Sequence, residues 1–312
     1  MEYKICSKTI MDTSDPNIVF NRNGESDYYT NFHQNIKPDW ESDVSNKNKL
    51  IDLAESIKKN SKPENDFDCI IGLSGGLDSS YLAHVATKIM GLKPLLLHVD
   101  AGWNTEQAVS NIEKLVNGLN LDLYTDVINW EQMKNIQRAF LKSQISDQDL
   151  PQDAAFFSSL YKFAIKYNIK HILTGANFST ECCREPEEWG GYPGIDKILF
   201  NDILTKYGDT KIGCFPLVDI LKYKVWDRYI NGMKVVKPLN LVKFNKIQAE
   251  KLLNDKYDWK PYKHKHHESR FTRFYEDYWL PQKFGYEKRR AHFSSLILTG
   301  QMKREDALKR IS

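Results

Sequence analysis

One short run of the sequence, Ser74-Gly75-Gly76-Leu77-Asp78-Ser79-Ser80, has the residue types that bind a phosphorylated ligand. Two glycines allow a tight turn, so that backbone N–H groups can converge on an anion at the start of a helix. The run lacks the Gly-Lys-Ser/Thr ending of a P-loop and the third glycine of a dinucleotide fingerprint. It therefore predicts a pyrophosphate-binding loop of another kind, with a plain helix N-cap as the alternative.

The segments around this run predict the fold that positions it. An apolar strand precedes the run and a helix follows it to Ile89, and this alternation continues along the chain. The predicted strands are 68–73, 94–99, 121–128 and 170–174, and the predicted helices include 105–119, 131–141, 153–167 and 246–253. Strands separated by helices indicate a parallel, doubly wound α/β sheet with its ligands at the carboxyl ends of the strands.

The composition is that of a globular protein with a basic C-terminal region. The 312 residues are 41% hydrophobic and 27% charged, with a formal net charge of +3, which excludes a disordered chain or a coiled coil. No apolar run reaches the ~18 to 20 residues that cross a bilayer, and no signal peptide is evident, so we expect a cytoplasmic protein without membrane contact. From residue 255 onward 14 Lys and Arg face 8 Asp and Glu, which favours an anionic ligand for this tail.

Through the signature Ser-Gly-Gly-x-Asp-Ser at 74–79, the chain resembles the PP-loop ATP pyrophosphatase superfamily. The resemblance implies an adenine nucleotide α-hydrolase-like fold, ATP and Mg2+ as cofactors, and a reaction that forms an adenylate and releases pyrophosphate. It implies further nucleotide contacts after the second and fourth strands, although ordinary loop capping is the alternative for Thr174 and Asn177. The residues expected to bind ATP or its pyrophosphate are Ser74, Gly75, Gly76, Asp78, Ser79, Ser80, Val99, Asp100, Thr174 and Gly175.

The tail is similar to the C-terminal region of the N-acetyl sugar amidotransferases of bacterial surface-polysaccharide biosynthesis. The similarity lies in Trp259, in 263–274 (KHKHHESRFTRF), in 280–285 (LPQKFG) and in 288–292 (KRRAH). Segments 11–16, 20–24 and 177–181 fit the same family. The resemblance implies that ATP adenylates the acetamido carbonyl of an N-acetylated, nucleotide-linked sugar. Ammonia then displaces AMP and leaves an acetamidino group, as in lipopolysaccharide O-antigen biosynthesis.

This chemistry needs positioning and charge neutralisation, because an amide oxygen is a weak nucleophile with no proton to remove. Asp78 is the expected ligand of Mg2+. Lys263 and Arg273 are expected to bind the pyrophosphate or acidic groups of the acceptor, with Lys263 favoured for the pyrophosphate. The residues expected on the substrate side are Asn177, Glu181, Trp189, His264, Glu268, Ser269 and Arg270. A solvated basic face is the alternative for the tail, although its interleaved aromatic residues favour packing.

The chain supplies no recognisable glutaminase. Residue 2 is Glu2, so no N-terminal cysteine nucleophile can form, and no other cysteine has a recognisable histidine partner. Family resemblance implies that a separate glutaminase complex, similar to the histidine-biosynthesis glutaminase and its barrel partner, supplies the ammonia. A homo-oligomer is compatible with the sequence, and we expect no nucleic-acid partner.

The start of the chain departs from the pattern of its relatives. They carry a pair of Cys-x-x-Cys motifs, a spacing suited to tetrahedral zinc. Here the four positions are Cys6, Thr9, Ser26 and Tyr29. A single sulfur cannot hold a structural zinc, so we predict that this chain lacks that metal.

Three regions follow from these patterns. We expect an N-terminal appendage, degenerate relative to a zinc ribbon, with a linker helix over 1–66, an ATP-binding domain over 67–235 and a substrate region over 236–312. Two other functions stay open. One is a tRNA-modifying PP-loop enzyme, a thiolase or a lysidine-type ligase, to which a basic tail would also be suited. The other is a nucleotide-binding homologue without catalytic activity.

Overall fold

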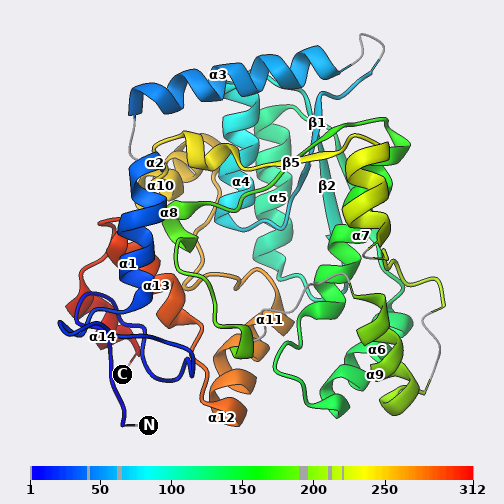
Figure 1. Ribbon diagram of the computed structural model, residues 1–312. Helices are drawn as coiled ribbons and strands as arrows, with labels where there is room; N and C mark the ends of the chain where they lie inside the picture. The colour runs from blue at the N-terminus through cyan, green and yellow to red at the C-terminus, as the bar shows by residue number, and fades with distance from the viewer. Residues whose placement is uncertain are drawn as a thin grey trace.

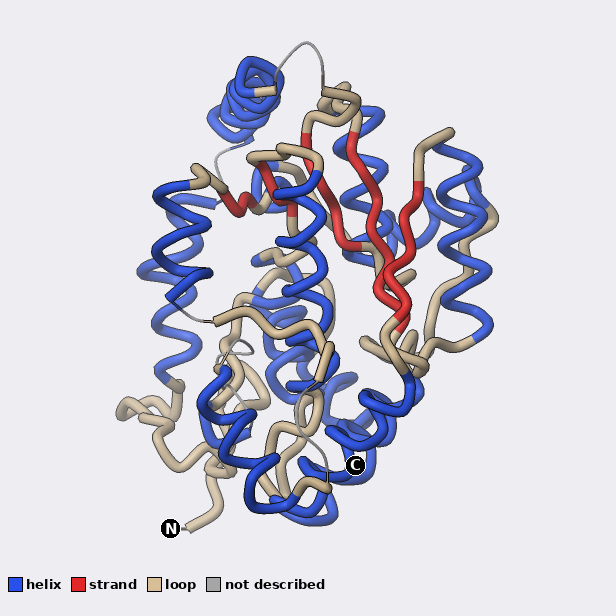
Figure 2. The backbone as a smooth tube through the Cα atoms, turned by 90° about the vertical axis from the view of Figure 1, so that its right-hand side faces the viewer, coloured by secondary structure: helices blue, strands red, loops and turns tan. Residues whose placement is uncertain are grey.

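A computed structural model describes residues 2–40, 43–61, 65–189, 196–209, 213–219 and 221–311. Five parallel strands form one sheet in the order β3-β2-β1-β4-β5. Their bounds are β1 Cys69–Gly72, β2 Pro94–Asp100, β3 Leu123–Val127, β4 His171–Leu173 and β5 Lys234–Val236. Figure 2 shows the strands grouped in one layer with helices on either side. The doubly wound parallel α/β sheet predicted from the sequence is confirmed.

The longer helices lie between the strands and at both ends of the chain (Figure 1). They are α3 Asp43–Asn60, α4 Leu77–His84, α5 Glu106–Leu119, α6 Trp130–Ser143, α7 Leu150–Lys166, α9 Lys197–Tyr207, α10 Lys246–Tyr257, α13 Arg289–Leu298 and α14 Arg304–Ile311. Shorter α-helices are α1 Asp27–Asn31, α2 Lys37–Trp40, α8 Phe178–Glu181, α11 Arg270–Phe274 and α12 Leu280–Phe284. Within the described ranges, no helix is both long and apolar enough to cross a membrane.

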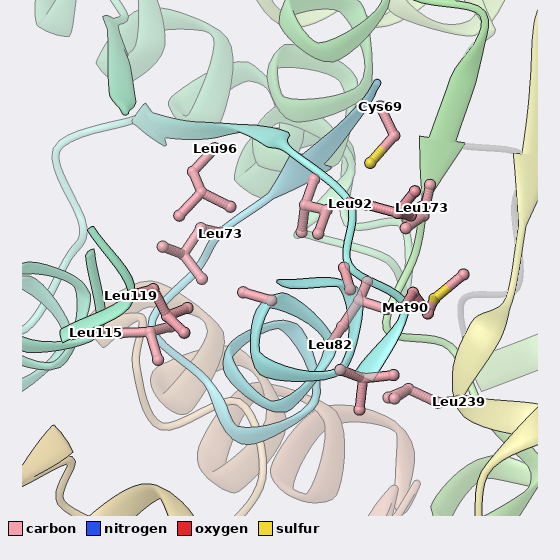
Figure 3. Packing of buried hydrophobic residues seen from close by; sticks show 14 of the residues in the cluster. Cys69, Leu73, Leu82, Met90, Leu92, Leu96, Leu115, Leu119, Leu173 and Leu239 are labelled. Atoms are coloured by element: carbon pink, nitrogen blue, oxygen red, sulfur yellow. The ribbon is translucent and has the colours of Figure 1, made fainter. Parts of the chain in front are cut away.

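Alternating side chains of the buried strands hold the helices on the two faces of the sheet. Cys69, Ile71 and Leu96 pack with α3, α4, α5 and α10 in one core, part of which Figure 3 shows. Ile70 and Leu95, one position along, pack against α7 on the other face. This period of two, in strands that are apolar on both faces, is typical of a parallel sheet covered on both sides.

The C-terminal helices are placed at the carboxyl ends of the strands and against the start of the chain. Arg304 of α14 donates hydrogen bonds from Nε to the Thr9 carbonyl, at 2.9 Å, and from Nη2 to the Cys6 carbonyl, at 2.8 Å. Ile10 is buried with Phe293 in the same region. In Figure 1 the blue N-terminal segment accordingly lies beside the red C-terminal helices. The mainly helical C-terminal region predicted from the sequence is confirmed.

Candidate functional site

The phosphate loop joins β1 to α4 and is held from behind by the tail. Gly75 has a left-handed backbone with φ +82°, and a Cβ atom there would lie 2.7 Å from the Ala108 carbonyl oxygen, so the position favours glycine. Its own carbonyl oxygen accepts hydrogen bonds from Trp259 Nε1 and from the Tyr262 hydroxyl, both at 3.2 Å. Gly76 is the N-cap of α4, so the helix begins at the loop as predicted.

Two carboxylates and one lysine meet beside this loop. Lys265 Nζ lies 3.5 Å from Asp78 Oδ2 and forms an ion pair with Glu181 Oε1. Burial raises the pKa of Asp78, although Lys265 opposes the shift. Burial also disfavours the charged form of Glu181, but Lys265 outweighs it and lowers the pKa of that carboxyl. Asn177 completes the group, because its Nδ2 donates to Asp78 Oδ1 at 3.3 Å.

A second set of ion pairs begins at the neighbouring residue, His266. His266 Nδ1 lies 3.0 Å from Glu276 Oε1, and Lys288 Nζ lies 2.9 Å from Glu185 Oε2 and 3.6 Å from Glu276 Oε1. Burial disfavours the charged imidazole of His266, but Glu276 outweighs it and raises the pKa to about 9. His266 is therefore a cation at neutral pH, and its left-handed φ of +61° is uncommon for a residue with a side chain.

Of these groups, Asp78, Glu181, Lys265 and His266 line one cavity of about 340 Å3 between the carboxyl ends of β1 and β4. The strand order changes direction at these two strands, which is where open α/β sheets bind their ligands. One wall is apolar and is formed by Phe156, Phe157, Leu160, Tyr161, Ile172 and Val235. The other wall carries the loop and the charged residues. An aromatic ring and a phosphate chain can thus bind in one cavity.

A smaller cavity of about 50 Å3 adjoins the first and shares Lys246, His264, Lys265, His266 and His292 with it. Its wall also carries Lys263, Arg289 and Arg310. The His292 Nε2 atom is enclosed without a hydrogen-bond partner among the described residues. Burial and the nearby lysines hold its pKa well below the usual range, so the ring is neutral. The same wall carries the carboxylates Glu185, Glu276, Asp277 and Glu287, which pair with Lys288, His266, His267 and Arg289. Among the described residues, none of these carboxylates pairs with Lys263 or Arg310.

The structure brings many of the sequence-predicted residues together. Those that line the main cavity are Ser74, Gly76, Asp78, Ser79, Thr174, Gly175, Glu181, His264 and Glu268. Lys263 lines the second cavity instead. Gly75 shapes the loop from outside the cavity wall, and the buried Ser80 hydroxyl has no hydrogen-bond partner in the described part of the chain.

Other predicted residues lie elsewhere. Asp100 Oδ1 accepts from the Gly102 N–H at 2.8 Å and from Asn104 Nδ2 at 3.0 Å, and neither Asp100 nor Val99 lines the cavity. Trp189 is fully buried and stacks on Tyr286. Ser269 caps α11 by accepting the Thr272 N–H at 3.2 Å.

The two predicted arginines of α11 lie outside both cavities. Arg270 is exposed, and Arg273 reaches only Asp277, at 3.9 Å, with 67% of its side chain exposed. They are the first and fourth residues of a helix, whereas the residues that face the cavity come from the irregular segment before it.

Sequence reasoning missed several functional side chains. Lys265 and His266 lie in the same basic run as Lys263, and nothing in their spacing indicates which of them faces Asp78. Trp259 and Tyr262 support the loop from a segment nearly 190 positions later, as the hydrogen bonds to Gly75 show. The signals in the sequence were the interleaving of aromatic with basic residues and the family resemblance of Trp259 and 263–274, and neither of them assigns a contact to a particular residue.

The donor set at Asp78 and Glu181 fits magnesium. Asp78 and Glu181 already share one cation, Lys265, and Mg2+ usually takes one or two carboxylates together with phosphate oxygens and waters. Among the described residues, no three His, Cys, Asp or Glu side chains are grouped for a metal ion. At the start of the chain, Cys6 Sγ accepts N–H groups of Lys8, Thr9 and Ser26 at 3.2 to 3.4 Å, so hydrogen bonds hold that turn.

The parallel sheet, with the Ser-Gly-Gly-Leu-Asp-Ser loop between β1 and α4, is the arrangement that the resemblance to the PP-loop ATP pyrophosphatase superfamily implies. Residues 268–312 match the family model described as "LPS biosynthesis protein WbpG-like, C-terminal domain". This match confirms, for the C-terminal region, the resemblance to proteins of bacterial surface-polysaccharide biosynthesis.

Similarity to other proteins is more distant. A Pyrococcus furiosus protein named NH3-dependent NAD+ synthetase is 24% identical over 175 residues, which are 56% of this chain and 59% of that protein. The chain thus spans little more than half the length of this curated relative. The structure of NMN synthetase from Francisella tularensis has 20% identity and a TM-score of 0.32, and covers 70% of this chain and 93% of its own. The structure of NH3-dependent NAD synthetase from Campylobacter jejuni has 16% sequence identity and a TM-score of 0.36, and the match covers 70% of this chain and 94% of that chain.

Proposed function

We propose that the protein is an ATP-dependent amidotransferase that converts the acetamido group of an N-acetylated, nucleotide-linked sugar into an acetamidino group. The observation that supports this most strongly is that the phosphate loop and the C-terminal tail line the same cavity. The nucleotide loop comes from the sheet, and Lys265, His266 and Glu268 come from the tail, which enters the WbpG-like region at residue 268. The tail thus reaches the phosphate loop rather than forming a separate solvated face.

In the first proposed step the acetamido oxygen attacks the α-phosphorus of ATP and the bond to pyrophosphate breaks. The amide nitrogen loses its proton to solvent, which leaves an O-adenylated imidate. The loop N–H groups and the amino end of α4 face the phosphates. Lys265 and His266 supply positive charge beside them. Asp78 and Glu181 would hold Mg2+, which neutralises charge on the departing pyrophosphate.

In the second proposed step ammonia attacks the activated carbon, and the C–O bond to AMP breaks. The amidine forms as a cation, because the protons of ammonia stay on its nitrogens. Glu181 and Glu268 in the cavity wall can stabilise this cation. The ammonia would come from a separate glutaminase complex, so glutamine should not replace ammonium salts when the chain is assayed alone.

The second cavity supports an acidic acceptor. Lys263 and Arg310 lie there without carboxylate partners in the described part of the chain. The nearby Lys246 has a long ion pair, with 4.0 Å between its Nζ and Glu250 Oε1. A carboxylate or phosphate of the acceptor would offset the mutual repulsion of these cations. The guanidinium of Arg310 is kept in place over Phe293, at 5.2 Å from the ring centroid.

The test is an incubation with ATP, Mg2+, ammonium and a panel of N-acetylated nucleotide sugars, with AMP and the modified sugar measured by mass spectrometry. If the acetamido oxygen carries a heavy isotope, that isotope should appear in AMP, because the proposed step joins this oxygen to the α-phosphorus. AMP without the label would contradict adenylation of the amide. AMP formed only when tRNA is added would favour a tRNA-modifying enzyme instead.

A further inference from the structure

A carboxylate of the tail lies in the phosphate loop itself. Glu268 Oε1 accepts a hydrogen bond from the Ser74 hydroxyl, with 3.2 Å between the oxygens. A Cβ atom placed on Gly76 would lie 2.6 Å from the same Oε1 atom. The carboxylate therefore fills the space that the absent side chain of Gly76 leaves open at the start of α4.

The features that favour a phosphate at this place also favour the carboxylate. Glycine allows close approach of a ligand to the backbone, and the amino end of a helix attracts negative charge. Asp78 carries a second carboxylate on the first turn of the same helix. An incoming triphosphate therefore meets the carboxylates of Asp78 and Glu268, and the Glu268 carboxylate occupies the position in the loop where a phosphate would bind.

The backbone of Glu268 is fixed, so only its side chain is free to leave. Its carbonyl oxygen accepts the Thr105 N–H at 3.0 Å, and the Arg270 N–H donates to the Trp103 carbonyl at 2.8 Å. Asn104 and Ser269 pair between them in an antiparallel bridge. Since Glu268 itself lines the cavity of about 340 Å3, its carboxylate has room to rotate away from the loop.

We propose that Glu268 is a gate of the nucleotide site: its carboxylate competes with phosphate groups for the loop, and phosphates bind when it rotates away. The inference rests on the proposed function, because it takes a nucleotide as the ligand of the loop. Two anions cannot share one place without repulsion. The competition should therefore weaken binding most for a phosphate ligand that arrives without a divalent cation.

Isothermal titration of the full chain with inorganic pyrophosphate in EDTA measures this competition. Glu268→Gln keeps the shape and removes the charge, so it should bind pyrophosphate at least about tenfold more tightly than the wild type. Glu268→Asp retains the charge on a shorter side chain, and its gain should be smaller. Glu106→Gln is the matched control, because Glu106 is exposed just after Thr105 and outside the cavity, and its affinity should stay unchanged.

An affinity in Glu268→Gln that equals or falls below that of the wild type would overturn the gate. Titration with ATP and Mg2+ separates this failure from failure of the proposed function. If the wild type binds ATP with Mg2+ while Glu268→Gln gains nothing with pyrophosphate, the gate is wrong and the nucleotide site stands. If the folded wild type does not bind ATP with Mg2+, both ideas fail together. Circular dichroism of each variant establishes that it is folded.

Discussion

The phosphate loop and the tail face each other across one cavity, but they are encoded differently. The loop is a run of neighbouring residues between a strand and a helix, so its geometry follows from local sequence. In the tail, Lys263 and Lys265 are two positions apart, yet only Lys265 pairs with Asp78. The basic residues of the tail predicted that the site would carry positive charge, but tertiary packing determines which lysine contacts Asp78.

The largest effect should come from the loop. Asp78→Asn removes a carboxylate that we expect to hold Mg2+ on the phosphates, so AMP formation should fall by at least about a hundredfold. Circular dichroism should show an intact fold, because burial disfavours the charge of Asp78 in any case.

Asp100→Asn is the matched control for this substitution. Asp100 also follows a strand, but it bonds to Gly102 and Asn104 and lies outside the cavity. AMP formation should remain close to that of the wild type. Equal losses in the two variants would mean that the nucleotide extends over both strand ends, as the sequence alone suggested.

The next effect contrasts the two lysines. Lys265→Met leaves Asp78 and Glu181 together without their cation, and should lower the free energy of unfolding by about 1 to 3 kcal/mol at neutral pH. Added Mg2+ should recover part of this loss, because it can replace the ammonium group between the carboxylates. Urea unfolding with and without Mg2+ measures both quantities.

Lys263→Met provides the internal comparison, because it alters the same segment without breaking an ion pair in the described part of the chain. Its free energy of unfolding should change by less than about 0.5 kcal/mol. A similar loss in both lysine variants would show that the tail acts as a diffuse basic surface and not as a set of placed charges.

The fold could be predicted further than the site. Strands β1, β2 and β4 and the helices between the first four strands followed from apolar runs and helical periodicity, since buried strands are conspicuous. The edge strand β3, which has no buried residue, was predicted within 121–128. The fifth, Lys234–Val236, was missed because it has only three residues and none of them is buried. Helix α9, Lys197–Tyr207, was also missed, since its N-cap follows a segment rich in Gly and Pro.

For the site, the sequence predicted what is local and missed what depends on distance along the chain. The Ser-Gly-Gly-Leu-Asp-Ser loop could be read directly. The contact of Glu268 with Ser74 could not, because 194 positions separate them and only the packing of the tail brings them together. Arg273 has the right type but lies on the exposed side of α11.

A smaller effect should appear in the pH dependence of stability. The folded-state pKa of His266 is about 9 against an ordinary value of 6.5, because Glu276 outweighs burial. The stabilisation that protonated His266 adds to the free energy of unfolding is therefore complete below about pH 6.5 and is lost as the pH rises through about 9. His266→Gln should cost about 1 kcal/mol at low pH, after allowance for solvent screening, and little at pH well above 9. Unfolding of both proteins in urea across this range provides the measurement.

The smallest effect is expected at Arg273, a residue of the type expected to bind anions that lies outside both cavities. With 67% of its side chain exposed and one carboxylate at 3.9 Å, Arg273→Ala should change the free energy of unfolding by less than about 0.5 kcal/mol. Because Arg273 lines neither cavity, the KM values for ATP and for the acceptor should also stay unchanged. A higher KM for the acceptor alone, at unchanged stability, would show that a bound acceptor extends beyond both cavities to the outer side of α11, and would make Arg273 a substrate contact after all.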